Sequence, residues 1–294
     1  MPASLKANNA VLDALGSRSR KLPKVMESQL HIAYISSKYS TLLGQYEGSS
    51  TGLLPAPHTL VCALDTELSI LQNRYSETWS PATEIAFLGA RLNLYAYVLA
   101  DCPPNSAPSL EPNEDSVEFI VLGGRAAVRL LHIVHTSPHE LAKGTQHTDY
   151  CVVYAVLFLL RIFGTTQKAL IDETAVWNAI SQTWTLLKGL SKVERDHMAR
   201  ICTIIEYVTN CVDWKGEIPA PGKVRSLMAN NFIADIVIRA RQRYHAHAES
   251  AADGMVQACE TEETRFPNWS EFRFEDQDTL LAEFGDIFES YGLS

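Results

Sequence analysis

The 294-residue sequence has no apolar stretch long enough to cross a bilayer. Its most hydrophobic run, YCVVYAVLFLL (150–160), is far shorter than the ~20 residues that a membrane-spanning helix needs. The first residues, MPASLKANNAVLDALGSRSRKLPK, also lack the charged and then apolar pattern of a secretory signal peptide. We therefore expect no membrane association, and we interpret the apolar run as a buried core helix.

Several motifs of metal, redox and cofactor sites are missing as well. The six cysteines, at positions 62, 102, 151, 202, 211 and 259, form no C-x-x-C pair, so we interpret them as free and mostly buried thiols. The sequence has no H-E-x-x-H zinc motif, no P-loop and no G-x-G-x-x-G fingerprint. We therefore expect no enzymatic activity, no cofactor and no metal ion.

Helical periodicity dominates what is present, and the alternation typical of strands is almost absent. The predicted helices span 25–46, 59–78, 80–102, 117–136, 147–163, 171–189, 191–212 and 222–248. Residues 103–116, rich in Pro, Asn and Ser, are expected to form an exposed loop. Ser80 before Pro81 is a typical helix start. The sequence thus predicts an all-α fold with one large multi-helix domain.

The domain organisation follows from composition. We expect a flexible arm over 1–24, the helical domain over 25–248, a linker over 249–268 and an acidic, aromatic segment over 269–294. Residues 260–294 hold ten acidic residues and two arginines, which is eight of the nine net negative charges of the chain. Spacings of three and four put Leu280 or Leu281, Phe284, Phe288 and Tyr291 on one helical stripe, which can enter a partner's groove or pack on its own domain.

Other candidate sites are weaker. His132 and His135 share a helix face, with His147 and Asp149 nearby, but Pro138 places His139 beyond the helix end, so surface histidines are favoured over a metal site. Gly123 and Gly124 before Arg125 indicate close helix packing rather than an anion site. Asp65 and Glu67 lie two apart and so face different sides of a helix.

Two basic runs are candidate nucleic-acid contacts. The first contains Arg18, Arg20, Lys21 and Lys24, and the second contains Arg239, Arg241 and Arg243. Both are narrower than the footprint of a typical DNA-binding domain, so direct DNA binding by this chain is not expected.

Three stretches occur in an informative order: FLGARLNLYAYVLADCPP (87–104), RDHMARICTIIEYV (195–208) and GKVRSLMANNFIADIVIRARQRY (222–244). Together they resemble the helical regulatory region, or middle homology region, of fungal zinc-cluster (Zn2Cys6) transcription factors. The likeness extends loosely from about residue 25 to the C-terminus. The six cysteines are too widely spaced for the family's zinc cluster. The resemblance therefore implies an all-α regulatory domain in the nucleus, without DNA recognition of its own.

Such factors often end in acidic, aromatic segments that recruit the transcription machinery, and this favours the partner-binding interpretation of the tail. Its expected anchors toward a coactivator or another regulatory protein are Trp269, Phe272, Phe274, Leu281, Phe284, Ile287 and Phe288. The helical body is expected to sense a partner or a small apolar ligand. Candidate pocket residues are Tyr95, Tyr97, Tyr154, Phe158 and Trp184, and each of them is also a natural core residue.

Two alternatives remain open at this point. One is an all-α enzyme of lipid or terpenoid metabolism, although no D-D-x-x-D run is present. The other is a ligand-free dimerisation scaffold, although no sustained heptad repeat supports it. Homodimer formation is left open by the sequence.

Overall fold

A computed structural model describes residues 22–44, 54–100, 114–142, 146–163, 169–193 and 196–211. Within these ranges the regular structure is helical and contains no strand, so the prediction of an all-α fold is confirmed. The α-helices are α2 (Lys24–Gly44), α3 (His58–Tyr75), α4 (Pro81–Ala100), α5 (Glu114–Thr136), α6 (His139–Ala142), α7 (Gln146–Phe163), α8 (Glu173–Leu190) and α9 (His197–Cys211), and the short 3-10 helix η1 (Ser76–Thr78) follows α3.

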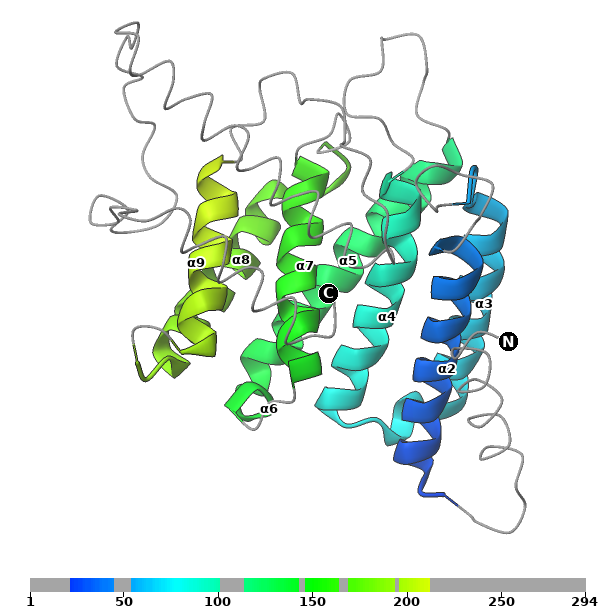
Figure 1. Cartoon of the computed structure of the whole chain (residues 1–294), viewed down its shortest axis with the longest axis horizontal. Helices are drawn as coiled ribbons and strands as arrows, with labels where there is room; N and C mark the ends of the chain where they lie inside the picture. Colours follow the sequence, from blue (N-terminus) through cyan, green and yellow to red (C-terminus); the bar gives the residue numbers. More distant parts are fainter. Residues whose placement is uncertain are drawn as a thin grey trace, which may run out of the picture.

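The long helices form two layers (Figure 1). Helices α2, α4, α7 and α9 lie side by side in the nearer layer, and α3, α5 and α8 lie behind them. Consecutive long helices run in opposite directions, so each packs mainly against helices that are close to it in the chain. One contiguous hydrophobic core fills the space between the layers.

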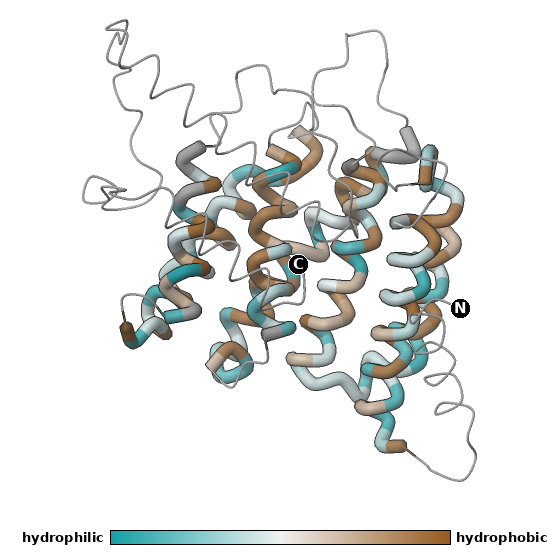
Figure 2. Tube along the Cα trace, viewed as in Figure 1, coloured by the Kyte–Doolittle hydropathy of each residue, from teal (hydrophilic) through white to brown (hydrophobic). Residues whose placement is uncertain are grey.

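Helix α7 lies in the middle of this arrangement. All residues from Cys151 to Phe163 are buried, so its hydrophobic side chains are not confined to one stripe (Figure 2). Helices α4, α5 and α9 contact it. The prediction that residues 150–160 belong to a core helix is confirmed. Among the described helices, none has the length and hydropathy needed to cross a membrane.

Two helix starts are set by side chains that accept hydrogen bonds from free backbone N–H groups. The hydroxyl of Ser80 accepts from the backbone N–H of Thr83 at 3.2 Å, and α4 begins at the next residue, Pro81. The carboxylate of Asp172 accepts from the backbone N–H of Ala175 at 3.1 Å, just before α8. The predicted start of the helix over 80–102 is thus confirmed.

Helix α9 begins later than the predicted helix over 191–212. Asp196 determines this because its Oδ1 accepts from the backbone N–H of Ala199 at 2.8 Å and caps the helix. Its Oδ2 accepts from the backbone N–H groups of Lys192 at 2.6 Å and Val193 at 3.2 Å, which holds the preceding residues in a turn. The prediction of helix over 191–196 was therefore wrong at the described residues 191–193 and 196.

The predicted loop over 103–116 also needs correction at its end, because α5 already begins at Glu114. The sequence at this point is Glu-Asp-Ser, and acidic residues are favoured in the first turn of a helix. Residues 101–113 lie outside the described part of the chain, as do the predicted helix over 222–248, the linker and the acidic segment.

Candidate functional site

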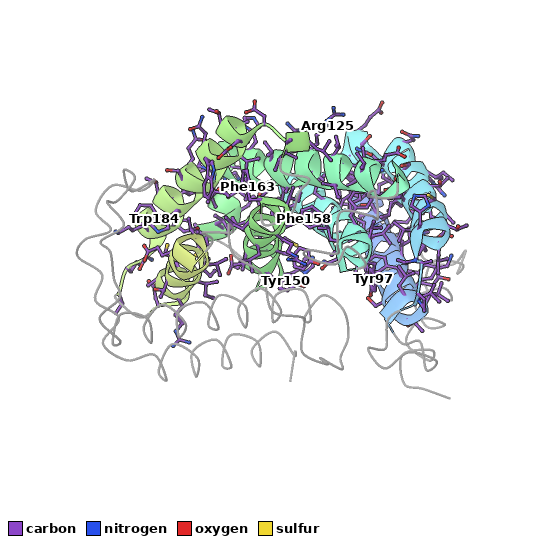
Figure 3. The ribbon with its side chains drawn as sticks, turned by 90° about the horizontal axis from the view of Figure 1, so that it is seen from above. Tyr97, Arg125, Tyr150, Phe158, Phe163 and Trp184 are labelled. Carbon is purple, nitrogen blue, oxygen red and sulfur yellow. The ribbon has the colours of Figure 1, made fainter. Side chains whose placement is uncertain are left out.

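The five candidate pocket residues divide into two groups. Tyr95 and Tyr97 lie on α4, and Tyr154 and Phe158 lie on α7; all four are buried. Trp184 lies on α8, partly exposed, where α8 meets α9 (Figure 3). The structure therefore brings the first four residues into the region between α4, α5 and α7, and places Trp184 at a separate location near the other end of the body.

A glycine allows the close approach of aromatic residues in the first group. Gly123 on α5 lies so close to the ring of Phe158 that a Cβ at this position would be 2.5 Å from Phe158 Cε1 and 3.4 Å from Tyr95 Cδ2. A Cβ on the adjacent Gly124 would lie 3.0 Å from Ile171 Cγ2, whereas Arg125 is exposed. The interpretation of the Gly-Gly-Arg stretch as a close helix contact is confirmed.

The tyrosines of the core form a cluster. The rings of Tyr39 on α2 and Tyr97 on α4 meet edge to face, with centroids 6.2 Å apart, and Tyr154 is buried near both. Burial raises the pKa of Tyr39, Tyr97 and Tyr154 well above the ordinary value of a phenol. Burial likewise raises the pKa of the neighbouring Cys151 thiol to about 12. These groups are therefore neutral at physiological pH, and Cys151 is not an activated nucleophile.

Tyr95 belongs to a polar network that links α3 and α4. Its hydroxyl donates to Oδ1 of Asp65 at 2.6 Å, and Nε of Arg91 donates to the same oxygen at 3.0 Å. Arg91 also donates to the hydroxyl of Ser69 at 2.6 Å. Glu67 pairs instead with Lys38 on α2, which confirms that Asp65 and Glu67 serve different faces of α3. The contacts of Asp65 and Ser69 with Arg91 and Tyr95 all join α3 to α4, so the network is a structural cross-link between these two helices.

The contact between α8 and α9 differs from the other helix contacts described above because it contains a buried acidic side chain. The indole N–H of Trp184 donates to Oε1 of Glu206 at 2.7 Å, and Glu206 is only 4% exposed. On the outer side, Nζ of the exposed Lys188 lies 4.5 Å from the centroid of the Trp184 ring. Burial raises the pKa of Glu206, although the Trp184 hydrogen bond and the charge of Lys188 oppose this shift.

Cys202 adjoins this contact one helical turn before Glu206 on α9. Its Sγ lies 3.9 Å from the carbonyl oxygen of Trp184, and burial raises the pKa of the thiol to about 12. The buried group around Trp184, Glu206 and Cys202 is called the α8/α9 seam below. It can recognise a ligand by hydrogen bonding, but its thiol is not reactive.

The seam was not recognised from the sequence, although one signal was present. Glu206 interrupts the run ICTIIEYV on a helix whose Ile201, Cys202, Ile205 and Val208 are buried. An acidic side chain on the same side as such a stripe is an unusual choice, because burying a carboxylate without a partner is costly. Its partner, Trp184, had been singled out only as an aromatic pocket residue.

The histidines do not converge on a metal site within the described residues. His135 is the last histidine of α5, which ends at Thr136, and His139 begins the separate short helix α6. This confirms that Pro138 separates them. His147 is exposed, and its Nε2 lies 3.7 Å from Sγ of Cys151 one turn later.

The remaining candidate residues lie outside the described part of the chain. They are the tail anchors Trp269, Phe272, Phe274, Leu281, Phe284, Ile287 and Phe288, and the basic residues Arg18, Arg20, Lys21, Arg239, Arg241 and Arg243. Their roles stay predictions. Comparisons of the chain with models of protein families, with curated proteins and with solved structures gave no significant match.

Proposed function

We propose that this chain is a regulatory and effector module of a transcription factor of the fungal zinc-cluster type. Its helical body would sense a ligand or partner, and its acidic, aromatic C-terminal segment would contact a transcriptional coactivator. The chain would act in the nucleus and would rely on another protein, or another part of its own protein, to recognise DNA.

One observation supports the proposal most directly. Two of the stretches that resemble the family fall on helices that flank the central helix: residues 87–100 lie in α4, and residues 197–208 lie in α9. Both α4 and α9 pack on α7. The proposal requires that a ligand shift the packing of α7, because the two halves of the body meet at this helix.

The test is a reporter assay with the full chain fused to an unrelated DNA-binding domain. We expect the fusion to activate transcription above the level of the DNA-binding domain alone. Replacing the anchors Phe284 and Phe288 with Ala should reduce activation to background without lowering the melting temperature. Phe266→Ala, the same change in the predicted linker, is the matched control and should leave activation intact.

Three other outcomes of these experiments would contradict parts of the proposal. Activation that survives the double change would contradict the assignment of the tail as the effector segment. Loss of activation together with a lower melting temperature would mean that Phe284 and Phe288 pack on the helical body. A fluorescent fusion that stays outside the nucleus would contradict the proposed site of action.

A further inference from the structure

In the α8/α9 seam, one carboxylate oxygen has no hydrogen-bond donor among the described residues. Oε1 of Glu206 accepts the indole N–H of Trp184, which fixes the orientation of the carboxyl group. Its second oxygen, Oε2, is shielded from solvent, and no donor among the described residues lies within hydrogen-bonding distance. Buried polar atoms nearly always have a partner, so a fixed and unpartnered carboxylate oxygen requires an explanation.

A second polar atom on the same face of α9 is in the same situation. Thr209 follows Glu206 by three residues, which places the two side chains next to each other on the helix surface. The hydroxyl oxygen of Thr209 is also shielded from solvent and has no hydrogen-bond partner within the described ranges. One turn of α9 thus presents two buried oxygen atoms, one an acceptor and the other able to donate or accept.

We infer that the α8/α9 seam is a binding site for a small amphiphilic molecule that presents an O–H or N–H donor to Oε2 of Glu206. The hydroxyl of Thr209 supplies the second polar contact, and the indole ring of Trp184 supplies an apolar wall for the body of the ligand. This inference rests on the proposed function, because it names the chemical class of ligand that the helical body would sense.

Two residues of α8, Trp184 and Lys188, form the part of this contact that solvent reaches. Trp184, the hydrogen-bond partner of Glu206, is partly exposed, and the exposed Lys188 lies over its ring. Lysine side chains are long and change rotamer readily, and the ammonium group of Lys188 contacts the face of the ring. A ligand that displaces Lys188 reaches the indole first and the carboxyl group next.

The donor can belong to an alcohol or to an ammonium group, and both would satisfy Oε2. Either donor favours the carboxylate form of Glu206, and an ammonium group does so more strongly because its charge adds to the hydrogen bond. The two sources therefore differ in the pH dependence of binding. A molecule of the same shape without a donor would leave Oε2 unpaired and should bind weakly.

The test uses the full 294-residue chain and three probes of similar shape. They are 2-phenylethanol, 2-phenylethylammonium and the methyl ether of 2-phenylethanol, and binding is measured by calorimetry and by ligand-observed NMR. We expect the alcohol, the ammonium compound or both to bind, and the ether to bind roughly tenfold more weakly or worse, the loss of about one hydrogen bond. A gain in affinity with rising pH that is larger for the ammonium compound would identify a cationic ligand, and tighter binding of the alcohol at every pH a neutral one.

The variants locate the site. Glu206→Gln keeps the shape of the side chain and the acceptor for Trp184, but offers a donor in place of Oε2, so binding should fall roughly tenfold. Thr209→Val should weaken binding by a smaller factor. Glu173→Gln is the matched control, because Glu173 also accepts from a tryptophan indole, that of Trp177 at 3.3 Å, but on the exposed side of α8. It should bind as the wild type does, and circular dichroism checks that all three variants fold.

Three results would overturn the inference. They are no detectable binding of any probe, equal binding to wild type and Glu206→Gln, and binding of the ether as tight as that of the alcohol. Failure here is distinguishable from failure of the proposed function. A chain that activates the tethered reporter but binds none of these probes would retain the function and lose this site.

Discussion

Gly123 on α5 and Phe158 on α7 approach so closely that any side chain at Gly123 would overlap the aromatic ring. Gly123→Ala should therefore lower the free energy of unfolding by about 1–3 kcal/mol, the usual cost of overpacking a core. Chemical denaturation monitored by circular dichroism measures the change. Gly189→Ala is the control, because nothing lies within 4 Å of a Cβ there; it should be neutral or stabilising, since Ala favours helix.

The same contact predicts a rescue. Phe158→Leu shortens the side chain that faces Gly123, so the double variant with Gly123→Ala should be more stable than the sum of the two single effects implies. If the changes in unfolding free energy of the two single variants simply add in the double variant, the close contact between Gly123 and Phe158 would be contradicted.

The network of Asp65, Arg91 and Tyr95 predicts a cost for removing a single hydroxyl group. Tyr95→Phe loses the 2.6 Å hydrogen bond to Oδ1 of Asp65, and hydrogen bonds to charged acceptors contribute about 1.5–3 kcal/mol. The value expected here lies at the lower end, because Arg91 still donates to the same oxygen. Tyr34→Phe, on the partly buried side of α2, is the control and should change the unfolding free energy little. Equal stability of Tyr95→Phe and wild type would contradict a structural role for the network.

Asp196 predicts a stability change in the acidic range. Burial opposes the shift, but hydrogen bonds from the backbone N–H groups of Ala199, Lys192 and Val193 lower its pKa to about 2. The stabilisation is therefore fully present above the ordinary pKa of aspartate and is lost as the pH falls toward 2. At neutral pH, Asp196→Ala should cost ~1 kcal/mol by removing the cap. Asp196→Asn keeps one acceptor oxygen and should cost less. The gap between wild type and Asp196→Ala, followed by thermal unfolding from pH 7 down to pH 2, should close at the acidic end.

Glu206 predicts the opposite trend. Its pKa is raised in the folded protein, so folding favours the protonated form. The contribution to stability is complete below the ordinary pKa of glutamate and is lost as the pH rises through the raised value. Glu206→Gln cannot ionise, so its melting temperature relative to wild type should rise with pH across this window. A constant difference between the two proteins would mean that the pKa of Glu206 is not raised.

The helices of the body could be predicted because their signals are local. The apolar spacing of residues 25–46 or 147–163 and the Ser80-Pro81 start depend only on neighbours in the chain. The predicted start of the last described helix was wrong because helical periodicity continues through 191–196. In the structure, the carboxylate of Asp196 accepts hydrogen bonds from three backbone N–H groups, which hold a turn before α9 and cap the helix itself. Where α9 begins therefore depends on which backbone groups the Asp196 side chain reaches, and the spacing of apolar residues does not reveal this.

The α8/α9 seam could not be predicted from the sequence, for a different reason. Trp184 and Glu206 belong to different helices, and a sequence pattern does not indicate which aromatic residue will meet which acid. The assignment of Trp184 to one pocket with Tyr95 and Phe158 grouped residues by type, whereas the fold separates them into two regions. An acid among buried apolar residues, as at Glu206, is a more informative signal than a set of aromatic residues, because its burial demands a specific partner.

The arrangement of the two layers also bears on how the protein is made. Because α2, α3, α4 and α5 contact one another in chain order, they can pack while the rest is still being synthesised. Helix α7 then emerges with apolar residues around its circumference, and its contact with α9 must wait until α9 has left the ribosome. At about 5–20 residues per second, this interval lasts on the order of seconds. During this interval the side of α7 that will meet α9 is uncovered, and a chaperone that binds apolar helices would act there.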